Sequence, residues 1–277
     1  MQTFSIQDLE VGSNTLTIIA GPCMIESIET CEQVAKHIQT LCRKYGFQYI
    51  FKSSFDKANR TSVHSKRGID MQAGLEILGH IQKKYQVPTT TDIHLPQQAE
   101  PVAKVVDLFQ IPAFLCRQTD LLEAAAKTGK PVHVKKGQFL APWDVKNIVD
   151  KLEHFNASGI LLTERGTTFG YNRLIVDMAG LEIMRGFGHP VCFDATHSIQ
   201  NPAGAGTSTG GNRQSIPALV RAAVAVGVDA LYLEIHPDPK NALSDAECQW
   251  PLDQADWLFN QIDVIRKAYL QMSALVQ

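Results

Sequence analysis

The feature that most constrains this chain is a regular alternation of short apolar runs with longer amphipathic stretches along its whole length. The short runs are rich in β-branched residues, which is typical of buried parallel strands, whereas the longer stretches have the periodicity of helices. We expect eight strands, in the runs 16–23, 48–54, 87–94, 106–112, 131–137, 159–166, 190–198 and 230–236. The pattern predicts an α/β fold built from repeated strand–helix units.

Eight such units fit a closed (β/α)8 barrel, or TIM barrel, and a chain of 277 residues is long enough to form one as a single domain, 1–277. The alternative is a doubly wound open sheet. Against it, no GxGxxG motif follows the first predicted strand, where a dinucleotide-binding fold needs one. We expect helices over 27–46, 71–86 and 120–130, and a short N-terminal β-hairpin within 1–15 that plugs the barrel floor.

Composition and charge exclude several classes of protein. The 26 Lys and Arg residues against 28 Asp and Glu residues leave a net charge of −2, so no overall positive field favours nucleic acid or a lipid surface. The N-terminus does not resemble a signal peptide, and no apolar run is long enough to span a membrane, which predicts a cytoplasmic protein. The six cysteines form no CxxC pair, which argues against a zinc ribbon and a disulfide framework.

Each predicted strand finishes in polar or ionisable side chains. These are Cys23, Lys52 and Ser54, Asp92 and His94, Gln110, Lys135, Arg165, Asp194 and His197, and Glu234 and His236. In a barrel the carboxyl ends of the strands surround one mouth, where the loops carry the chemistry. The sequence therefore predicts a functional site at that end.

Five cations belong to this mouth or to the loops beside it: Lys52, Lys57, Arg60, Lys135 and Arg165. Their mutual repulsion is relieved by bound anions, which predicts a phosphorylated substrate. The alternative is a structural network in which Lys135 and Arg165 pair with Glu164, Asp194 or Asp92. The Gly-rich stretch 203–213 lacks the lysine of a P-loop, so we interpret it as a lid over the mouth.

A candidate metal site lies at three neighbouring strands of the closed barrel. Cys23, His197 and Glu234 end strands one, seven and eight, and Asp245 follows in the next loop. A thiolate, an imidazole and two carboxylates suit a divalent transition ion such as zinc or iron(II). From spacing alone, a cysteine at a strand end such as Cys23 is more often a small residue of the core than a metal ligand.

A set of motifs in chain order resembles one enzyme family, the 3-deoxy-D-manno-octulosonate 8-phosphate synthases, also called 2-dehydro-3-deoxyphosphooctonate aldolases. The motifs are GPCMIES, FKSSFDKANRTS, TDIHLPQQAE, QIPAFLCRQTDLL, VKKGQF, TERGTTFGYNRLIVDM, FDATHSIQ, GGNR and LEIHPDP. The resemblance implies condensation of phosphoenolpyruvate with D-arabinose 5-phosphate, in the biosynthesis of the Kdo sugar of lipopolysaccharide, by a homotetramer. KANRTS distinguishes it from the related 3-deoxy-D-arabino-heptulosonate 7-phosphate synthases.

The resemblance also implies roles for individual residues. Lys52, Ser54, Lys57, Gln110, Lys135 and Arg165 are expected to bind phosphoenolpyruvate, and Asn59, Arg60 and Thr61 the sugar phosphate. The family has metal-requiring and metal-free forms, and cysteine at position 23 with Ser244 indicates the metal-requiring form. Its ligands are then Cys23, His197, Glu234 and Asp245, for zinc, iron(II) or manganese. Lys57, His197 and Asp245 are the expected catalytic residues.

Two departures and two alternatives remain. Thr61 replaces a commoner serine, and SDAE replaces a commoner SDGP around Asp245, which leaves the conformation of the loop 240–250 open. The first alternative function is heptulosonate phosphate synthesis from erythrose 4-phosphate. The second is a barrel that only binds sugar phosphates and has no catalytic activity.

Overall fold

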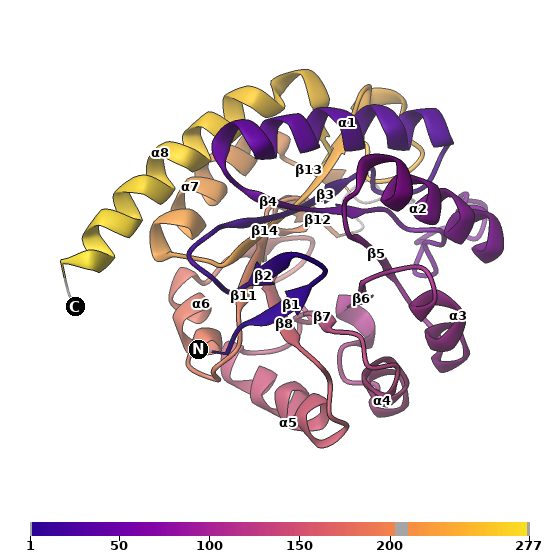
Figure 1. Ribbon diagram of the computed structural model, residues 1–277, viewed down its shortest axis with the longest axis horizontal. Coiled ribbons are helices and arrows are strands. Elements are labelled where there is room, and N and C mark those ends of the chain that lie inside the picture. Colours follow the sequence, from indigo (N-terminus) through magenta and orange to yellow (C-terminus); the bar gives the residue numbers. More distant parts are fainter. Residues whose placement is uncertain (1, 203–209, 276–277) are drawn as a thin grey trace.

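The computed structural model describes residues 2–202 and 210–275 and forms a closed barrel of parallel strands (Figure 1). Its strands are β3 (Thr17–Gly21), β4 (Gln48–Lys52), β5 (Thr89–Asp92), β6 (Leu108–Ile111), β7 (Val132–Lys135), β8 (Ile160–Glu164), β11 (Val191–Asp194) and β14 (Ala230–His236). Each pairs in parallel with the next, and β14 pairs with both β11 and β3, which closes the ring. The predicted (β/α)8 barrel is confirmed, and the open sheet is wrong.

Helices surround the barrel and connect its strands. They are α1 (Ile28–Tyr45), α2 (Met71–Tyr85), α3 (Ala99–Ala103), α4 (Thr119–Lys127), α5 (Lys146–His154), α6 (Met178–Arg185), α7 (Ile216–Val226) and α8 (Ala255–Ala274). The first helix shows why the predicted bounds succeed: the Ser27 hydroxyl accepts a hydrogen bond from the Thr30 N–H, and Gly46 ends the helix at φ 71°.

Seven of the eight predicted strands were too long at their carboxyl ends, whereas the run 230–236 coincides with β14. The run 190–198 contains a strand only as far as Asp194, after which the chain turns and His197–Ile199 forms a short 3-10 helix. Several of the polar residues that mark the strand ends are the last residues of their strands, as Lys52, Lys135 and Asp194 are, whereas others, such as Cys23 and His197, lie in the loops that follow. Alternation of side chains therefore identifies a strand better than it locates its end.

The N-terminal hairpin plugs the floor of the barrel, as predicted. Strand β1 (Phe4–Ile6) pairs antiparallel with β2 (Leu9–Val11), and Figure 1 shows the hairpin lying across the barrel strands. Its buried side chains pack on residues of the barrel interior: Ile19, Ile50, Leu108, Leu161, Cys192, Ala230 and Tyr232. We call these seven residues together the floor cluster.

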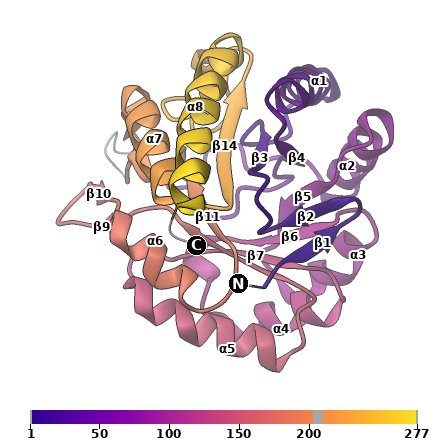
Figure 2. The ribbon, with the colours of Figure 1, turned by 60° about the vertical axis from the view of Figure 1, so that its left-hand side comes forward.

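The remaining strands are short and lie in the loops. They are β9 (Thr167–Thr168) and β10 (Leu174–Ile175), which form the projecting hairpin in Figure 2, β12 (Gln200–Asn201), β13 (Gly210–Gly211) and β15 (Trp250–Pro251). Strand β13 pairs with β12, so one end of the predicted lid 203–213 is anchored beside the mouth. Residues 203–209 lie outside the described residues, and the lid stays a prediction.

Two composition-based expectations can be compared with the structure. All six cysteines are buried and free, which confirms that they form no disulfide framework. Among the described residues, no helix combines the length and the apolarity that crossing a membrane requires.

Candidate active site

A cavity of about 780 Å³ opens where the carboxyl ends of the strands converge. Nine of the residues predicted for the site line it: Lys57, Asn59, Arg60, Thr61, Gln110, Lys135, Arg165, His197 and Asp245. The other four, Cys23, Lys52, Ser54 and Glu234, are buried directly behind these lining residues. The structure thus brings all thirteen predicted residues together at one end of the barrel.

Cys23 is placed by a close approach between the first two strands of the barrel. A Cβ atom on Gly21 would lie 1.9 Å from the carbonyl oxygen of Lys52, so only glycine fits there. The Cys23 N–H then donates to Gln249 Oε1 at 3.0 Å, and Gln249 Nε2 donates to the Ser244 carbonyl at 2.8 Å. Gln249 therefore ties the Cys23 loop to the loop that carries Asp245.

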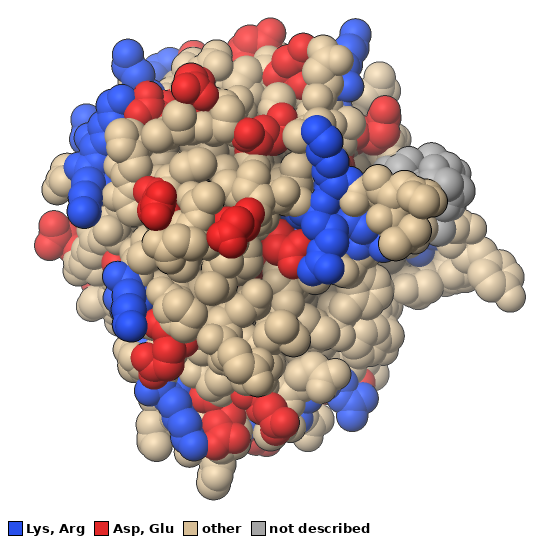
Figure 3. All heavy atoms as spheres, turned by 90° about the vertical axis from the view of Figure 1, so that its right-hand side faces the viewer, with Lys and Arg blue, Asp and Glu red and all other residues tan. Residues whose placement is uncertain are grey.

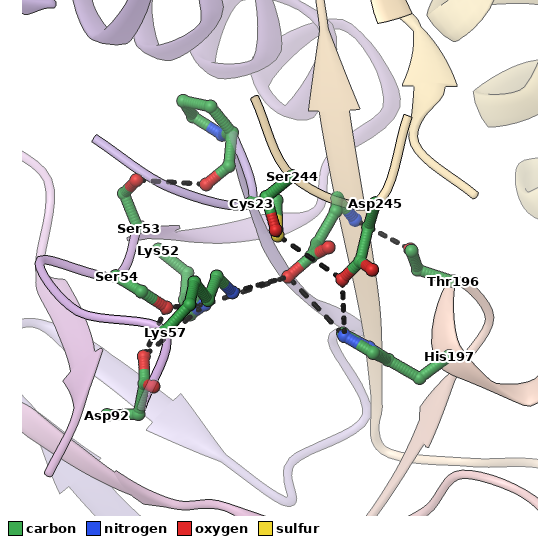
Figure 4. Close-up of polar contacts among 12 residues, drawn as sticks. Cys23, Lys52, Ser53, Ser54, Lys57, Asp92, Thr196, His197, Ser244 and Asp245 are labelled. Atoms are coloured by element: carbon green, nitrogen blue, oxygen red, sulfur yellow. Dashed lines mark hydrogen bonds and ion pairs between the residues drawn. The ribbon is translucent and has the colours of Figure 1, made fainter. Parts of the chain in front are cut away.

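The four predicted metal ligands form a compact group, of which Cys23, His197 and Asp245 are labelled in Figure 4. Ligand atoms of Cys23, Glu234 and Asp245 lie within 4.8 Å of one another, and His197 Nε2 lies 3.6 Å from Glu234 Oε1 and 3.7 Å from Asp245 Oδ2. Glu234 Oε2 is buried and has no hydrogen-bond partner among the described residues. A set of sulfur, nitrogen and oxygen donors with one unpaired carboxylate oxygen fits a divalent transition metal ion.

Burial and neighbouring charge act together on Cys23 but in opposite directions on Asp245. Burial, with the Glu234 charge adding to it, raises the pKa of the Cys23 thiol well above its usual range. Burial also acts to raise the pKa of Asp245, but the contact with His197, whose Nε2 lies 3.7 Å away, and the positive charge of that ring outweigh burial and lower it. Asp245 is therefore ionised at neutral pH, whereas the thiol needs an additional neighbouring cation to ionise.

His197 is oriented by a carboxylate behind it. Its Nδ1 lies 2.7 Å from Asp194 Oδ2, and Lys135 Nζ donates to the same oxygen at 2.6 Å. Because a carboxylate only accepts, Nδ1 of His197 carries a proton, and Nε2 faces Glu234 and Asp245. A carboxylate that fixes the ring through Nδ1 while Nε2 faces other donor groups is typical of a metal-ligating histidine.

Asp245 has a left-handed backbone conformation with φ 47°. Aspartate tolerates this conformation better than most residues, and its carbonyl accepts hydrogen bonds from the N–H groups of Cys248 and Gln249. The turn directs the carboxylate toward Cys23 Sγ, 3.4 Å away. The conformation of the SDAE loop, which the sequence left open, is thereby described.

The cations of the mouth are partly compensated by buried carboxylates. Lys52 Nζ donates to Ser54 Oγ at 2.6 Å and lies 3.6 Å from Asp92 Oδ1 and 3.7 Å from Glu234 Oε1. Lys57 Nζ is also 3.7 Å from Glu234 Oε1. On the face seen in Figure 3, surface Lys and Arg side chains form one column right of the centre with acidic side chains to its left, and others lie along the left edge.

The structural network that we considered as an alternative exists in part. Lys135 forms an ion pair with Asp194, as that alternative expected. Arg165 does not pair with a carboxylate: its Nη2 donates to Gln200 Oε1 at 2.7 Å, and its buried Nη1 has no partner among the described residues. Since both cations still line the cavity, the network leaves positive charge facing it.

Arg60 lies farther out than the other cations. Its Nε donates to the Lys66 carbonyl at 2.9 Å and its Nη2 to the Leu243 carbonyl at 3.0 Å. Asn59 and Thr61 beside it are exposed, whereas Lys135 and Arg165 are only 4% and 5% exposed. The cavity therefore has two cationic regions at different depths.

Comparison with known proteins identifies the family. The family model described as the DAHP synthetase I family matches residues 3–267. The chain belongs to this family. A protein of Cyanothece sp. (strain PCC 7425) named 2-dehydro-3-deoxyphosphooctonate aldolase is 55% identical over 262 residues, 94% of this chain and 96% of the relative. A protein of the same name from Rickettsia bellii is 53% identical over 258 residues, 93% and 94% of the two chains.

In this member of the DAHP synthetase I family, sequence reasoning missed several functional contacts. Asp194 was noted as a strand end and as a partner for cations, but not as the residue that orients His197. Gln200, which holds Arg165, and Ser244, whose Oγ lies 3.0 Å from Cys23 Sγ, had no contact assigned to them. Alternation along β11 gives the only signal, since it directs Cys192 and Asp194 to the same side.

Proposed function

We propose that this protein condenses phosphoenolpyruvate with D-arabinose 5-phosphate and water, and releases 3-deoxy-D-manno-octulosonate 8-phosphate and phosphate. The observation that carries the proposal is one cavity with two cationic regions at different depths, beside a cluster of metal-ligand type. Two phosphate esters can then bind with their reacting carbons between them. The names of the relatives support the same reaction, in the biosynthesis of the Kdo sugar of lipopolysaccharide.

The inner cationic region is proposed to hold phosphoenolpyruvate. Lys57, Lys135 and Arg165 supply charge for its phosphate and carboxylate, and Lys52, Ser54 and Gln110 complete the pocket. These cations are held in advance by buried partners, so they do not reorganise while charge develops. Preorganised donors of this kind stabilise a transition state by a few kcal/mol each, about 2.7–4.

The outer region is proposed to hold the sugar phosphate. Arg60 is its main cation, and Asn59 and Thr61 add an amide and a hydroxyl at the edge of the cavity. The two carbonyls that accept from Arg60 fix its guanidinium, so its remaining N–H groups are oriented before the ligand arrives. We propose that the sugar aldehyde then lies on the side of the inner region.

In the proposed reaction, the methylene carbon of phosphoenolpyruvate forms a bond with the aldehyde carbon, and the oxygen of water adds to the carbon that bears phosphate. The aldehyde oxygen takes up a proton and the water gives one up, which leaves a hydroxyl on the carbon that bears phosphate. The C–O bond to phosphate then breaks, as this hydroxyl gives its proton to the departing phosphate and becomes the keto oxygen of the product. Lys57, His197 and Asp245 are the proposed catalytic residues, Lys57 as a fixed charge and the other two as proton carriers. No Schiff base is required.

Cys23, His197, Glu234 and Asp245 are proposed to bind zinc, iron(II) or manganese. A bound ion of this kind supplies Lewis acidity and orients an oxygen atom of the aldehyde or of water. The chain's own contribution is the orientation of the ligands: Asp194 fixes the His197 ring, and the backbone turn at Asp245 directs its carboxylate. We further propose that the enzyme works in the cytoplasm as a homotetramer, which light scattering of the purified protein tests.

Release of phosphate from phosphoenolpyruvate tests the function. We expect rapid release with arabinose 5-phosphate, slow release with erythrose 4-phosphate and none without a sugar. The opposite preference between the two sugars would favour a heptulosonate phosphate synthase. Binding of both esters without any phosphate release would favour a non-catalytic binding protein.

A further inference from the structure

Tyr232 lies at the boundary between the floor cluster and the ionised mouth. It belongs to β14, is 1% exposed, and pairs in register with Asp194 of β11 and Ile19 of β3. Its side chain is part of the floor cluster. Because alternate residues of a strand point to the same side, Tyr232 and Glu234 both project into the barrel, one layer apart.

The hydroxyl of Tyr232 reaches one specific oxygen of Glu234. A phenol is protonated at neutral pH, so Tyr232 donates to Glu234 Oε1, 3.1 Å away. Lys52, Lys57 and His197 also approach this same oxygen, at 3.7, 3.7 and 3.6 Å. The positive partners therefore gather on Oε1 and leave Oε2, which has no partner among the described residues, for an ion.

The ring of Tyr232 makes a second contact with the mouth. Lys135 Nζ lies 3.4 Å from the ring centroid, so the ammonium is held between the aromatic face and Asp194 Oδ2. A cation over an aromatic face is attracted by the negative charge of that face. The contact keeps Lys135 in place without adding another carboxylate that would cancel its charge.

We propose that Tyr232 is a positioning residue with two separable functions: its hydroxyl orients Glu234 for the metal ion, and its ring fixes Lys135. The proposal rests on the metal-dependent function proposed above. Phenylalanine at this position would keep the ring and lose the hydroxyl, so it separates the two functions.

The test is binding of cobalt(II) to metal-free protein, followed by the absorption of the cobalt–thiolate bond and by competition with a chelator. We expect Tyr232→Phe to bind cobalt(II) about 10- to 100-fold more weakly, the usual cost of removing a partner of a metal ligand. Its affinity for phosphoenolpyruvate without metal stays that of the wild type. Tyr49→Phe is the matched control, since the buried Tyr49 hydroxyl donates to the Ala20 carbonyl at 3.1 Å, and its cobalt affinity stays unchanged.

A second variant, Tyr232→Leu, removes the ring as well. We expect the same loss of cobalt affinity and, in addition, weaker binding of phosphoenolpyruvate to the metal-free protein. If Tyr232→Phe does not fold by circular dichroism, the cobalt affinity of Tyr232→Leu decides. Wild-type affinity for cobalt in the folded variant overturns the role of Tyr232 and leaves the proposed function intact, whereas a wild-type protein that binds no cobalt overturns both.

Discussion

The floor and the mouth of the barrel are built from the same strands, yet the floor buries apolar side chains and the mouth buries ionised ones. On β14, Ala230 packs in the floor cluster, whereas Glu234, four residues later on the same side, lies among the cations of the mouth. Both side chains are 0% exposed. Burial of apolar groups stabilises the fold, but burial of charge costs stability even when the charges are paired. The floor thus offsets what the mouth costs.

Removal of the metal should give the largest effect on the mouth. We expect chelation to lower the rate of phosphate release at least about 1,000-fold, since Lewis acidity is worth several kcal/mol, and readdition of a divalent ion to restore it. Cys23→Asn should weaken metal retention while the protein stays folded. Cys31→Ala, a change at another buried cysteine, is the control. Full activity of the metal-free enzyme would show that the reaction requires no metal ion.

Loss of one cation of the mouth should have the next largest effect. We expect Lys135→Met to lower kcat/KM about 100- to 1,000-fold, because one preorganised donor is lost. Steady-state kinetics with varied phosphoenolpyruvate measures it. Lys146→Met is the matched control, since Lys146 is exposed and, in the part of the chain that the structure describes, forms an ion pair only with Asp150 one turn away. Equal kinetics of the two variants would show that the charge of Lys135 serves the fold alone.

A change in the floor should lower the stability of the fold and leave catalysis unchanged. Phe4 of the hairpin packs directly on the backbone of Gly159, where an added Cβ would lie 2.4 Å from the ring. We expect Phe4→Ala to lower the free energy of unfolding by about 3 kcal/mol and leave kcat/KM unchanged. Urea denaturation measures the loss, and Phe169→Ala, at an exposed position, should change stability by less than about 0.5 kcal/mol. A loss of activity without a loss of stability would break the comparison.

The smallest predicted effect concerns a histidine between the two regions. Burial, with the charge of Lys135 adding to it, lowers the pKa of His133 to about 3. In the unfolded chain His133 therefore takes up a proton near pH 6.5, whereas in the folded protein it stays neutral until about pH 3. The free energy of unfolding falls as the pH drops from 6.5 toward 3. Between pH 7 and pH 5 this group should cost about 2 kcal/mol, which His133→Gln should abolish. Urea denaturation at both pH values checks it, and an unchanged pH dependence in the variant would contradict it.

Much of the fold could be predicted from the sequence, because hydrophobic periodicity and the residues that end helices and strands are local properties. The strand–helix alternation, the Ser27 and Gly46 helix ends and the N-terminal hairpin each depend on a few adjacent residues. Most strand ends were placed too late. The run 190–198, for example, contains no local signal that separates the strand from the turn after Asp194.

The site was predicted in its residues more fully than in its contacts. Strand ends and the resemblance placed Lys135, His197 and Asp245 at one mouth, where the structure has them. The bond from His197 to Asp194 and that from Tyr232 to Glu234 were missed, because each depends on side-chain rotamers and the first also on the turn that follows β11. In the sequence, Tyr232 is simply one apolar member of the run ALYLEIH.

The left-handed turn at Asp245 restricts what evolution or an engineer can place there. Asparagine and glycine would accept the turn and give up the negative charge, whereas glutamate would keep the charge in a conformation it rarely adopts. Since Ala246 follows instead of a glycine, the next residue cannot adopt the left-handed conformation without strain. Aspartate alone satisfies both demands, so variation in this loop is expected around position 245 and not at it.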